Sequence, residues 1–162
     1  MKVDILAFGA HPDDVELGCG GTIALSIAQG KTVAIVDLTQ GELGTRGDIQ
    51  TRKNEAKKAS DILKICNREN LKLQDGFFEN NVANQLILIE KIRKYQPNII
   101  LCNSRKDRHI DHSKGNQLVN DSCFLSGLDK IDTFDQNGKN QLSWRPHIVL
   151  ESVSYTHLTL PT

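Results

Sequence analysis

Apolar runs alternate with amphipathic segments along most of this chain, and that alternation constrains its fold more than any other feature. Runs typical of buried strands stand at Val3 to Phe8, Thr32 to Leu38 and Asn98 to Cys102. Between them, apolar residues recur at helical spacing, most clearly from Thr51 to Cys66 and from Gln85 to Tyr95. Strands that alternate with helices predict a Rossmann-like α/β fold, with a mainly parallel sheet and helices on both faces.

Several shorter elements complete this prediction. A polar loop from His11 to Glu16 precedes a short predicted helix from Thr22 to Ala28. A later helix is expected from about Ser113 to Leu125, and short strands are expected at Leu71 to Leu73 and from Ile148 to Leu150. The chain therefore has enough strands and helices for one α/β domain.

Length and charge restrict the class of protein. The 162 residues suit one domain with a real core. Lys+Arg and Asp+Glu both number 20, so no basic excess indicates a nucleic-acid partner or a membrane surface. The apolar runs are too short for a bilayer span or a secretory signal, and we therefore expect a cytoplasmic protein.

The cysteines give no sign of a disulfide framework or a cysteine zinc site. The four of them are widely spaced and form no C-x-x-C pair: Cys19, Cys66, Cys102 and Cys123. Cys66 and Cys102 stand among apolar residues, so we expect reduced thiols in the core.

The C-terminal end departs from the α/β pattern. We expect residues 1–150 to form the domain and residues 151–162 to be a doubtful tail, possibly non-native. An α/β sheet does not normally end in mid-strand with an uncovered face, so we also expect the fold to be C-terminally truncated.

Two polar clusters each follow a predicted strand. The first, residues 9–16, reads G-A-H-P-D-D-V-E, and the second, residues 106–112, reads K-D-R-H-I-D-H. Open parallel sheets bind ligands outside the carboxyl ends of their strands. If the two strands are close in the sheet, one pocket should receive side chains from both clusters: His11, Asp13, Asp14, His109, Asp111 and His112.

These residue types suit a catalytic zinc ion. Imidazole and carboxylate groups are normal zinc ligands, and three protein ligands leave a fourth position open for water. The doubled Asp13-Asp14 fits a division of labour in which one carboxylate is a ligand and the other is a base. Pro12 fixes the backbone beside them.

Simpler interpretations stay open for each motif alone. H-P-D-D can be a helix N-cap with a turn proline, and H-x-D-H can be a solvated loop. Two such clusters at strand ends make coincidence less probable. Gly18 to Gly21 suggests a nucleotide-binding turn, but it lacks the G-x-G-x-x-G spacing and no P-loop lysine follows it. His147 and His157 lie near or within the tail and are not candidates.

At these motifs the sequence resembles the LmbE-like, or PIG-L, family of zinc-dependent N-acetylglucosaminyl deacetylases. The resemblance extends from Val3 to about Val149. Within the family, the chain looks most like the bacterial deacetylases of bacillithiol biosynthesis, which act on N-acetylglucosaminyl malate. The segments that carry the resemblance are Ala10 to Glu16, Gly18 to Thr22, Gly41 to Gly47, Arg52 with Glu55 and Ala56, and Asp107 to His112.

The resemblance implies a role for each matching residue. His11, Asp14 and His112 would bind Zn²⁺, and Asp13 would be the general base. His109 would stabilise the oxyanion or protonate the leaving amine, oriented by Asp111. The substrate's polar or carboxylate end would meet three arginines, which are Arg52, Arg108 and, as a weaker candidate, Arg46. For Arg52 the alternative is a solvated residue in the first turn of a helix.

The expected function is hydrolysis of an acetyl amide on a small N-acetylglucosaminyl conjugate, with Zn²⁺ as cofactor. The resemblance also implies a possible homo-oligomer, and family members continue well beyond the end of this chain. Two alternatives stay open: a non-catalytic sugar- or nucleotide-binding α/β module, and a truncated fragment without activity.

Overall fold

A computed structural model describes residues 1–152 of the chain, so His157 and most of the predicted tail lie outside the described residues. Five parallel strands form one sheet in the order β3-β2-β1-β4-β5. The strands are β1 (Ile5–Gly9), β2 (Val33–Thr39), β3 (Asn67–Leu73), β4 (Ile99–Asn103) and β5 (Ile148–Ser152). The predicted parallel α/β fold is confirmed.

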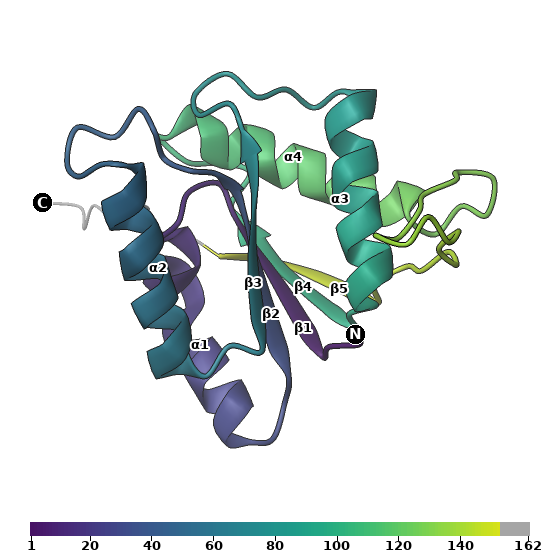
Figure 1. Cartoon of the computed structure of the whole chain (residues 1–162), viewed down its shortest axis with the longest axis horizontal. Coiled ribbons are helices and arrows are strands. Elements are labelled where there is room, and N and C mark those ends of the chain that lie inside the picture. The colour runs from purple at the N-terminus through teal and green to yellow at the C-terminus, as the bar shows by residue number, and fades with distance from the viewer. Residues whose placement is uncertain (153–162) are drawn as a thin grey trace, which may run out of the picture.

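Helices cover both faces of this sheet. Helices α1 (Asp14–Ala28) and α2 (Ile49–Leu63) lie on one face, and α3 (Val82–Tyr95) and α4 (Ile110–Leu125) lie on the other (Figure 1). In the part of the chain that the structure describes, no helix is both long and apolar enough to cross a membrane.

Strand alternation explains the two layers. In β1, Leu6 and Phe8 pack into the core under α3 and α4, whereas Ile5 and Ala7 pack into a separate core on the α1 side. Successive side chains of a strand point to opposite faces, so a strand that is apolar at every position supplies both cores. The continuous apolar runs in the sequence therefore mark the central strands.

Local signals fix the helices that were predicted most clearly. The carboxylate of Asp48 accepts a hydrogen bond from the backbone N–H of Thr51 at 2.6 Å and caps the start of α2. Asn81 caps α3 in the same way, accepting from the N–H of Asn84 at 3.0 Å. Gln96 ends α3 in the left-handed conformation, one residue before Pro97.

Three predicted boundaries are wrong. Helix α1 begins at Asp14 and not at Thr22, and α4 begins at Ile110 and not at Ser113, so parts of both polar clusters lie in first helical turns. Strand β3 begins at Asn67 and not at Leu71, because pairing with β2 extends a segment that has no apolar alternation.

The two cysteines predicted to lie in the core differ in burial. Cys102 is buried as predicted, but Cys66 is exposed, so its assignment to the core was wrong. Cys66 follows α2 at the margin of the sheet, where its thiol donates to the carbonyl of Val33. Glu151 and Ser152 continue β5 as partners of Cys102 and Asn103, and Glu151 pairs with Arg105 at 2.8 Å.

Candidate metal centre

The two polar clusters meet at the point where the chain reverses its direction through the sheet. From β1 the chain proceeds to β2 and β3 on one side, and it then crosses to β4 on the other side of β1. Strands β1 and β4 are direct neighbours, and their carboxyl ends lie at the same edge. This is the topological switch point at which open α/β sheets bind ligands.

The three predicted metal ligands are in contact there, and all three are buried. Oδ1 of Asp14 lies 3.1 Å from Nε2 of His112, and Oδ2 lies 3.4 Å from Nδ1 of His11. Oδ2 also accepts hydrogen bonds from the backbone N–H of His11 at 2.9 Å and from the side chain of Asn103 at 3.1 Å. Asp14 is therefore held between the two imidazoles.

The other nitrogen of each imidazole faces a carboxylate. Nδ1 of His112 lies 3.0 Å from Asp107, and Nε2 of His11 lies 3.1 Å from Asp75 and 3.4 Å from Asp111. Carboxylates in this position fix the tautomer and the orientation of a metal-binding ring. Both rings are thus oriented so that the nitrogens beside Asp14 are available to a ligand.

The donor set fits a zinc ion. Ligand atoms of His11, His109 and His112 all lie within 4.8 Å of one another, and so do those of His11, Asp75 and Asp111; neither of these two groups includes Asp14. Oδ1 of Asp111 is buried and accepts no hydrogen bond among the described residues, although Nζ of Lys114 lies 3.7 Å away. Imidazoles with buried carboxylates are the ligands that zinc prefers when cysteine is absent.

The site is electrostatically polarised. Burial alone would lower the pKa of His11, but Asp14, Asp75 and Asp111 outweigh it and raise the pKa to about 9. Burial would raise the pKa of the Asp14 carboxyl, but the two imidazoles hold it well below its usual range. The cluster therefore stabilises positive charge at its centre, as a cation site requires.

Asp13 stands apart from this buried cluster. Its side chain is 51% exposed, and burial of the rest together with the charge of Asp14 raises its pKa. It lines a cavity of about 590 Å³ with Arg46 and Arg52. The structure thus brings the predicted general base and two of the predicted substrate-binding residues into one cavity beside the site.

Arg52 is held close to the glycine-rich loop. Its Nη1 lies 3.9 Å from Asp13, and its side chain is only 23% exposed, so it is not a freely solvated residue. It lies across Gly41, whose φ is 65°, and a Cβ at that position would meet Nη1 at 3.0 Å. The positive φ favours glycine at this position, and a Cβ there would also make the flexible end of the Arg52 side chain shift slightly.

His109 is exposed, and its ring lies 4.6 Å from that of His11 and 4.9 Å from that of His112. Burial and the neighbouring imidazoles lower its pKa. Its Nδ1 accepts from the backbone N–H of Asp111 at 3.3 Å, whereas the carboxylate of Asp111 contacts His11 and the N–H of Gly76. Arg108 is exposed on the same loop.

Three residues that contact the predicted ligands received no role from the sequence. Asp75 follows β3 at the same edge of the sheet, and it also accepts from the N–H of Leu43 at 2.9 Å. Asn103 ends β4 and joins that strand to the first cluster, because it accepts from Ala10 and donates to Asp14. Asn103 directly follows a predicted strand, Asp75 comes two residues after another, and Asp107 lies in the second polar cluster, so a polar residue close to a strand end is the signal that could have identified them.

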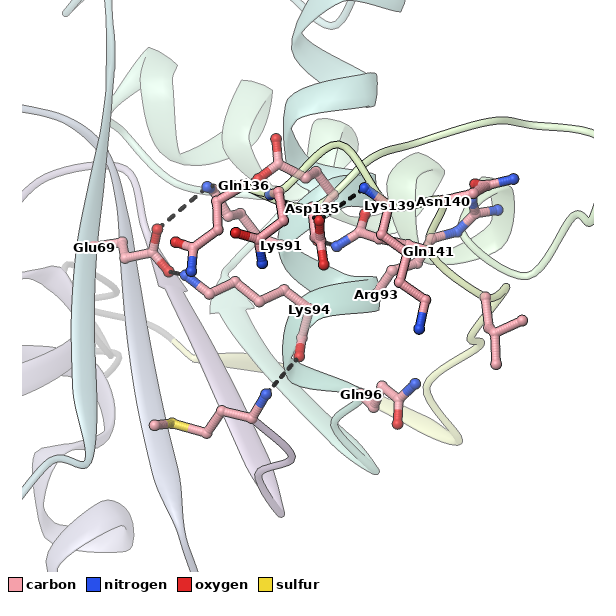
Figure 2. Close-up of a pocket in the computed structure, with 14 residues that line it drawn as sticks. Glu69, Lys91, Arg93, Lys94, Gln96, Asp135, Gln136, Lys139, Asn140 and Gln141 are labelled. Carbon is pink, nitrogen blue, oxygen red and sulfur yellow. Dashed lines mark hydrogen bonds and ion pairs between the residues drawn. The ribbon is translucent and has the colours of Figure 1, made fainter.

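A second cavity, of about 480 Å³, shares none of the predicted site residues. It lies between β3, α3 and the loop that contains Asp135 and Lys139 (Figure 2). Two of its lysines are paired within the protein: Lys94 contacts Glu69 at 2.6 Å, and Lys91 contacts Glu69 at 3.2 Å. Of these two cavities, the one beside Asp13 adjoins the candidate metal centre.

Known proteins resemble this chain in sequence and in structure. The uncharacterized deacetylase YaiS of Escherichia coli K12 is 36% identical over 114 residues, which are 67% of this chain and 61% of that protein. The diacetylchitobiose deacetylase of Thermococcus kodakarensis is 27% identical over 143 residues, 81% of this chain and 53% of that protein. The chain thus spans little more than half the length of these relatives.

A solved structure also resembles this chain over nearly its whole length. The conserved protein TT1542 from Thermus thermophilus superimposes with a TM-score of 0.86 at 33% identity, over 98% of this chain and 69% of that one. A family model described as PIG-L, GlcNAc-PI de-N-acetylase, matches residues 6–123 and so includes every predicted ligand. The chain therefore belongs to the PIG-L family.

Proposed function

We propose that this chain carries the catalytic centre of a zinc-dependent N-deacetylase. The substrate would be an N-acetylglucosaminyl conjugate, in particular N-acetylglucosaminyl malate of bacillithiol biosynthesis. The observation that carries the proposal is the contact of Asp14 with His11 and His112 at the switch point of the sheet. A cytoplasmic location and assembly into a homo-oligomer are further parts of the proposal.

His11, Asp14 and His112 would hold the metal through the atoms that face one another. Zinc, when bound, lowers the pKa of a water molecule and polarises the carbonyl of the substrate. Asp107, Asp75 and Asp111 would keep the two imidazoles in the tautomers that bind a cation.

Asp13 would take a proton from the attacking water, because it is the residue next to Asp14, it lines the cavity, and its pKa is raised. His109 would stabilise charge on the carbonyl oxygen or protonate the departing amine. The backbone N–H of Asp111 already holds its ring, and the Asp111 carboxylate would act chiefly through His11. Acetate and a free amine would be the products.

The arginines support an anionic substrate. Arg46 and Arg52 line the cavity that also contains Asp13, and Arg108 is exposed on the loop after β4. Guanidinium groups bind carboxylates through paired hydrogen bonds, which suits the malate group of the proposed substrate. The two named deacetylases among the relatives support the reaction type, and the chitobiose enzyme supports an acetylated amino sugar.

The deciding experiment measures zinc per chain and turnover of N-acetylglucosaminyl malate. We expect about one zinc ion in the wild-type protein and none in His112→Ala. Asp13→Ala should keep the metal and lose about a hundredfold to ten-thousandfold in turnover. His147→Ala, which removes an exposed histidine before β5, is the matched control and should change neither quantity.

Each alternative has its own outcome. A folded wild-type protein that takes up no zinc but binds the sugar would favour the non-catalytic module. A zinc-loaded protein that cleaves other acetylated amino sugars but not N-acetylglucosaminyl malate would keep the deacetylase and reject the bacillithiol substrate. Aggregation with exposed apolar surface would favour the inactive fragment.

A further inference from the structure

Arg68 is a largely buried arginine that connects most of the elements on the α1/α2 face of the sheet. It stands on β3, and its side chain is only 10% exposed. Nε and Nη2 donate to the two oxygens of Asp37 on β2 at 2.8 and 2.9 Å, a bidentate pair. Asp37 is itself buried, so the pair fixes the direction in which the guanidinium points.

The remaining contacts of Arg68 reach both helices on that face. Nη1 donates to the carboxylate of Glu16 in the first turn of α1. The same nitrogen donates to the carbonyl of Ala56 at 3.2 Å, and Ala56 is the buried residue of α2. One side chain therefore connects β2, α1 and α2, which come from separate parts of the sequence.

The first turn of α1 needs such an anchor. Cys19 has non-helical angles, with φ at −145°, and so separates this turn from the longer part of α1 that continues to Ala28. Asp13, at the N-cap, forms no side-chain cap. A turn this short is marginal without tertiary contacts. It nevertheless carries Asp13 and Asp14, whose positions decide the geometry of the site.

The energetics also indicate a role in positioning. Burial raises the pKa of Asp37 to about 6 despite the contact with Arg68, so desolvation offsets much of the attraction. Oε2 of Glu16 is buried without a hydrogen-bond partner among residues 1–152. A network with these costs contributes little net stability, and its clearest effect is to fix where Glu16 lies.

We infer that Arg68 is a positioning residue, which holds the turn bearing Asp13 and Asp14 against the sheet through Glu16. The inference rests on the proposed function, since that function gives the turn its catalytic importance. Arg68 contacts none of the predicted ligands and does not itself line the cavity beside Asp13, so its effect on the turn would pass through Glu16.

The test compares Arg68→Met with Arg93→Met. Arg93 is equally enclosed, but its guanidinium donates to the carbonyls of Ser126, Leu128 and Ile131 on the opposite face and lines the second cavity (Figure 2). Both variants remove a buried guanidinium, and both should lower the midpoint of urea unfolding. Only Arg68→Met should disturb the turn.

Hydrogen exchange reads the turn directly and needs no metal. The backbone N–H of Leu17 donates to the backbone carbonyl of Asp13 at 3.0 Å, and the backbone N–H of Asp14 donates to the backbone carbonyl of His11 at 3.3 Å. In Arg68→Met these amides should exchange at least about tenfold faster, whereas amides of α3 change little. Zinc affinity, measured by competition with a chelator, should fall about tenfold, at the low end for residues that support ligands.

Variants of Glu16 separate the contact from general destabilisation. Glu16→Gln keeps an oxygen that can accept from Nη1 of Arg68. Its amide exchange rates and its zinc affinity should therefore stay within about threefold of the wild-type values. Glu16→Met should reproduce the loss, and it keeps the test decisive if Arg68→Met does not fold. Unchanged exchange of Leu17 and Asp14 in Glu16→Met, or equal changes in Arg93→Met, would overturn the inference. Wild-type protein without zinc overturns the proposed function instead, and exchange still decides the role of Arg68.

Discussion

Two neighbouring residues of β3 connect the sheet to helices on its opposite faces. Arg68 points toward α1 and α2, where it joins Glu16 and Asp37. Glu69 points toward α3, where it accepts from Lys94 at 2.6 Å (Figure 2). It also accepts from the hydroxyl of Tyr95. Side chains of a strand alternate between faces, so one short polar strand supplies a charged contact to each layer.

The apolar packing of the two layers differs. Among residues 1–152, the core on the α3/α4 face contains 16 buried residues, whereas the core on the α1 face contains seven. Apolar burial dominates folding stability, at about 25 cal/mol per Å². We infer that the α3/α4 layer provides most of the stability, while the α1/α2 layer uses polar contacts to fix the position of the site residues.

The largest expected effect comes from removing a core side chain on the α3/α4 face. Ile92 is fully buried there, and Ile92→Ala should cost about 2–5 kcal/mol of the free energy of unfolding. Ile23→Ala on the α1 face should cost less, because fewer buried apolar residues surround it there. Urea unfolding of both variants measures the difference.

Metal binding gives this comparison its second readout. Under native conditions Ile92→Ala should keep its zinc stoichiometry, since the residue is remote from the predicted ligands. A larger loss of stability in Ile23→Ala than in Ile92→Ala would reverse the assignment of the two layers.

The next effect concerns Asn103, at the end of β4, which connects the sheet to Asp14 at the start of α1. Asn103 accepts from the N–H of Ala10 at 2.9 Å and donates to Asp14 at 3.1 Å. Asn103→Ala leaves buried polar groups unsatisfied and should cost about 1–3 kcal/mol. Zinc affinity should fall about tenfold to a hundredfold as Asp14 loses its support. Asn120→Ala, in the middle of α4, is the control, and an equal loss of affinity there would contradict the assignment.

The smallest effect is a pH dependence of opposite sign on the two faces. Burial raises the pKa of Asp37 to about 6, above its value in the unfolded chain. The folded state then binds the proton more tightly, so this group's contribution to stability falls as the pH rises from about 4 to about 6. For Glu69, burial would raise the pKa, but Lys94, Tyr95 and Lys91 hold it below its usual value. Its contribution is present above about pH 4.3 and is lost as the pH falls through the folded pKa.

Unfolding free energies measured from about pH 3 to about pH 6.5 separate the two groups, because the Asp37 contribution changes above about pH 4 and the Glu69 contribution changes below about pH 4.3. Asp37→Asn should remove the component that decreases with rising pH, and Glu69→Gln should remove the component that increases with it. The same slope change in both variants would show that the two carboxyls do not differ in this way.

The sequence predicted the central part of the fold because local signals and burial agree there. The apolar runs of β1, β2 and β4 and the capped helices α2 and α3 lie within a few residues of their predicted bounds. Strand β3 and the first turns of α1 and α4 were misjudged, because strand pairing and tertiary contacts shape them and no periodic pattern marks them.

The sequence by itself determined the types of residue at the site and their place after strands: His11 and Asp14 after β1, and His109 and His112 after β4. Only the tertiary structure decided that β1 and β4 are neighbours, that Asp75 from a third strand end faces His11, and that Arg68 joins Glu16 to Asp37. The physical reason is that strand order and side-chain direction depend on contacts between residues distant in the chain, which local spacing does not encode.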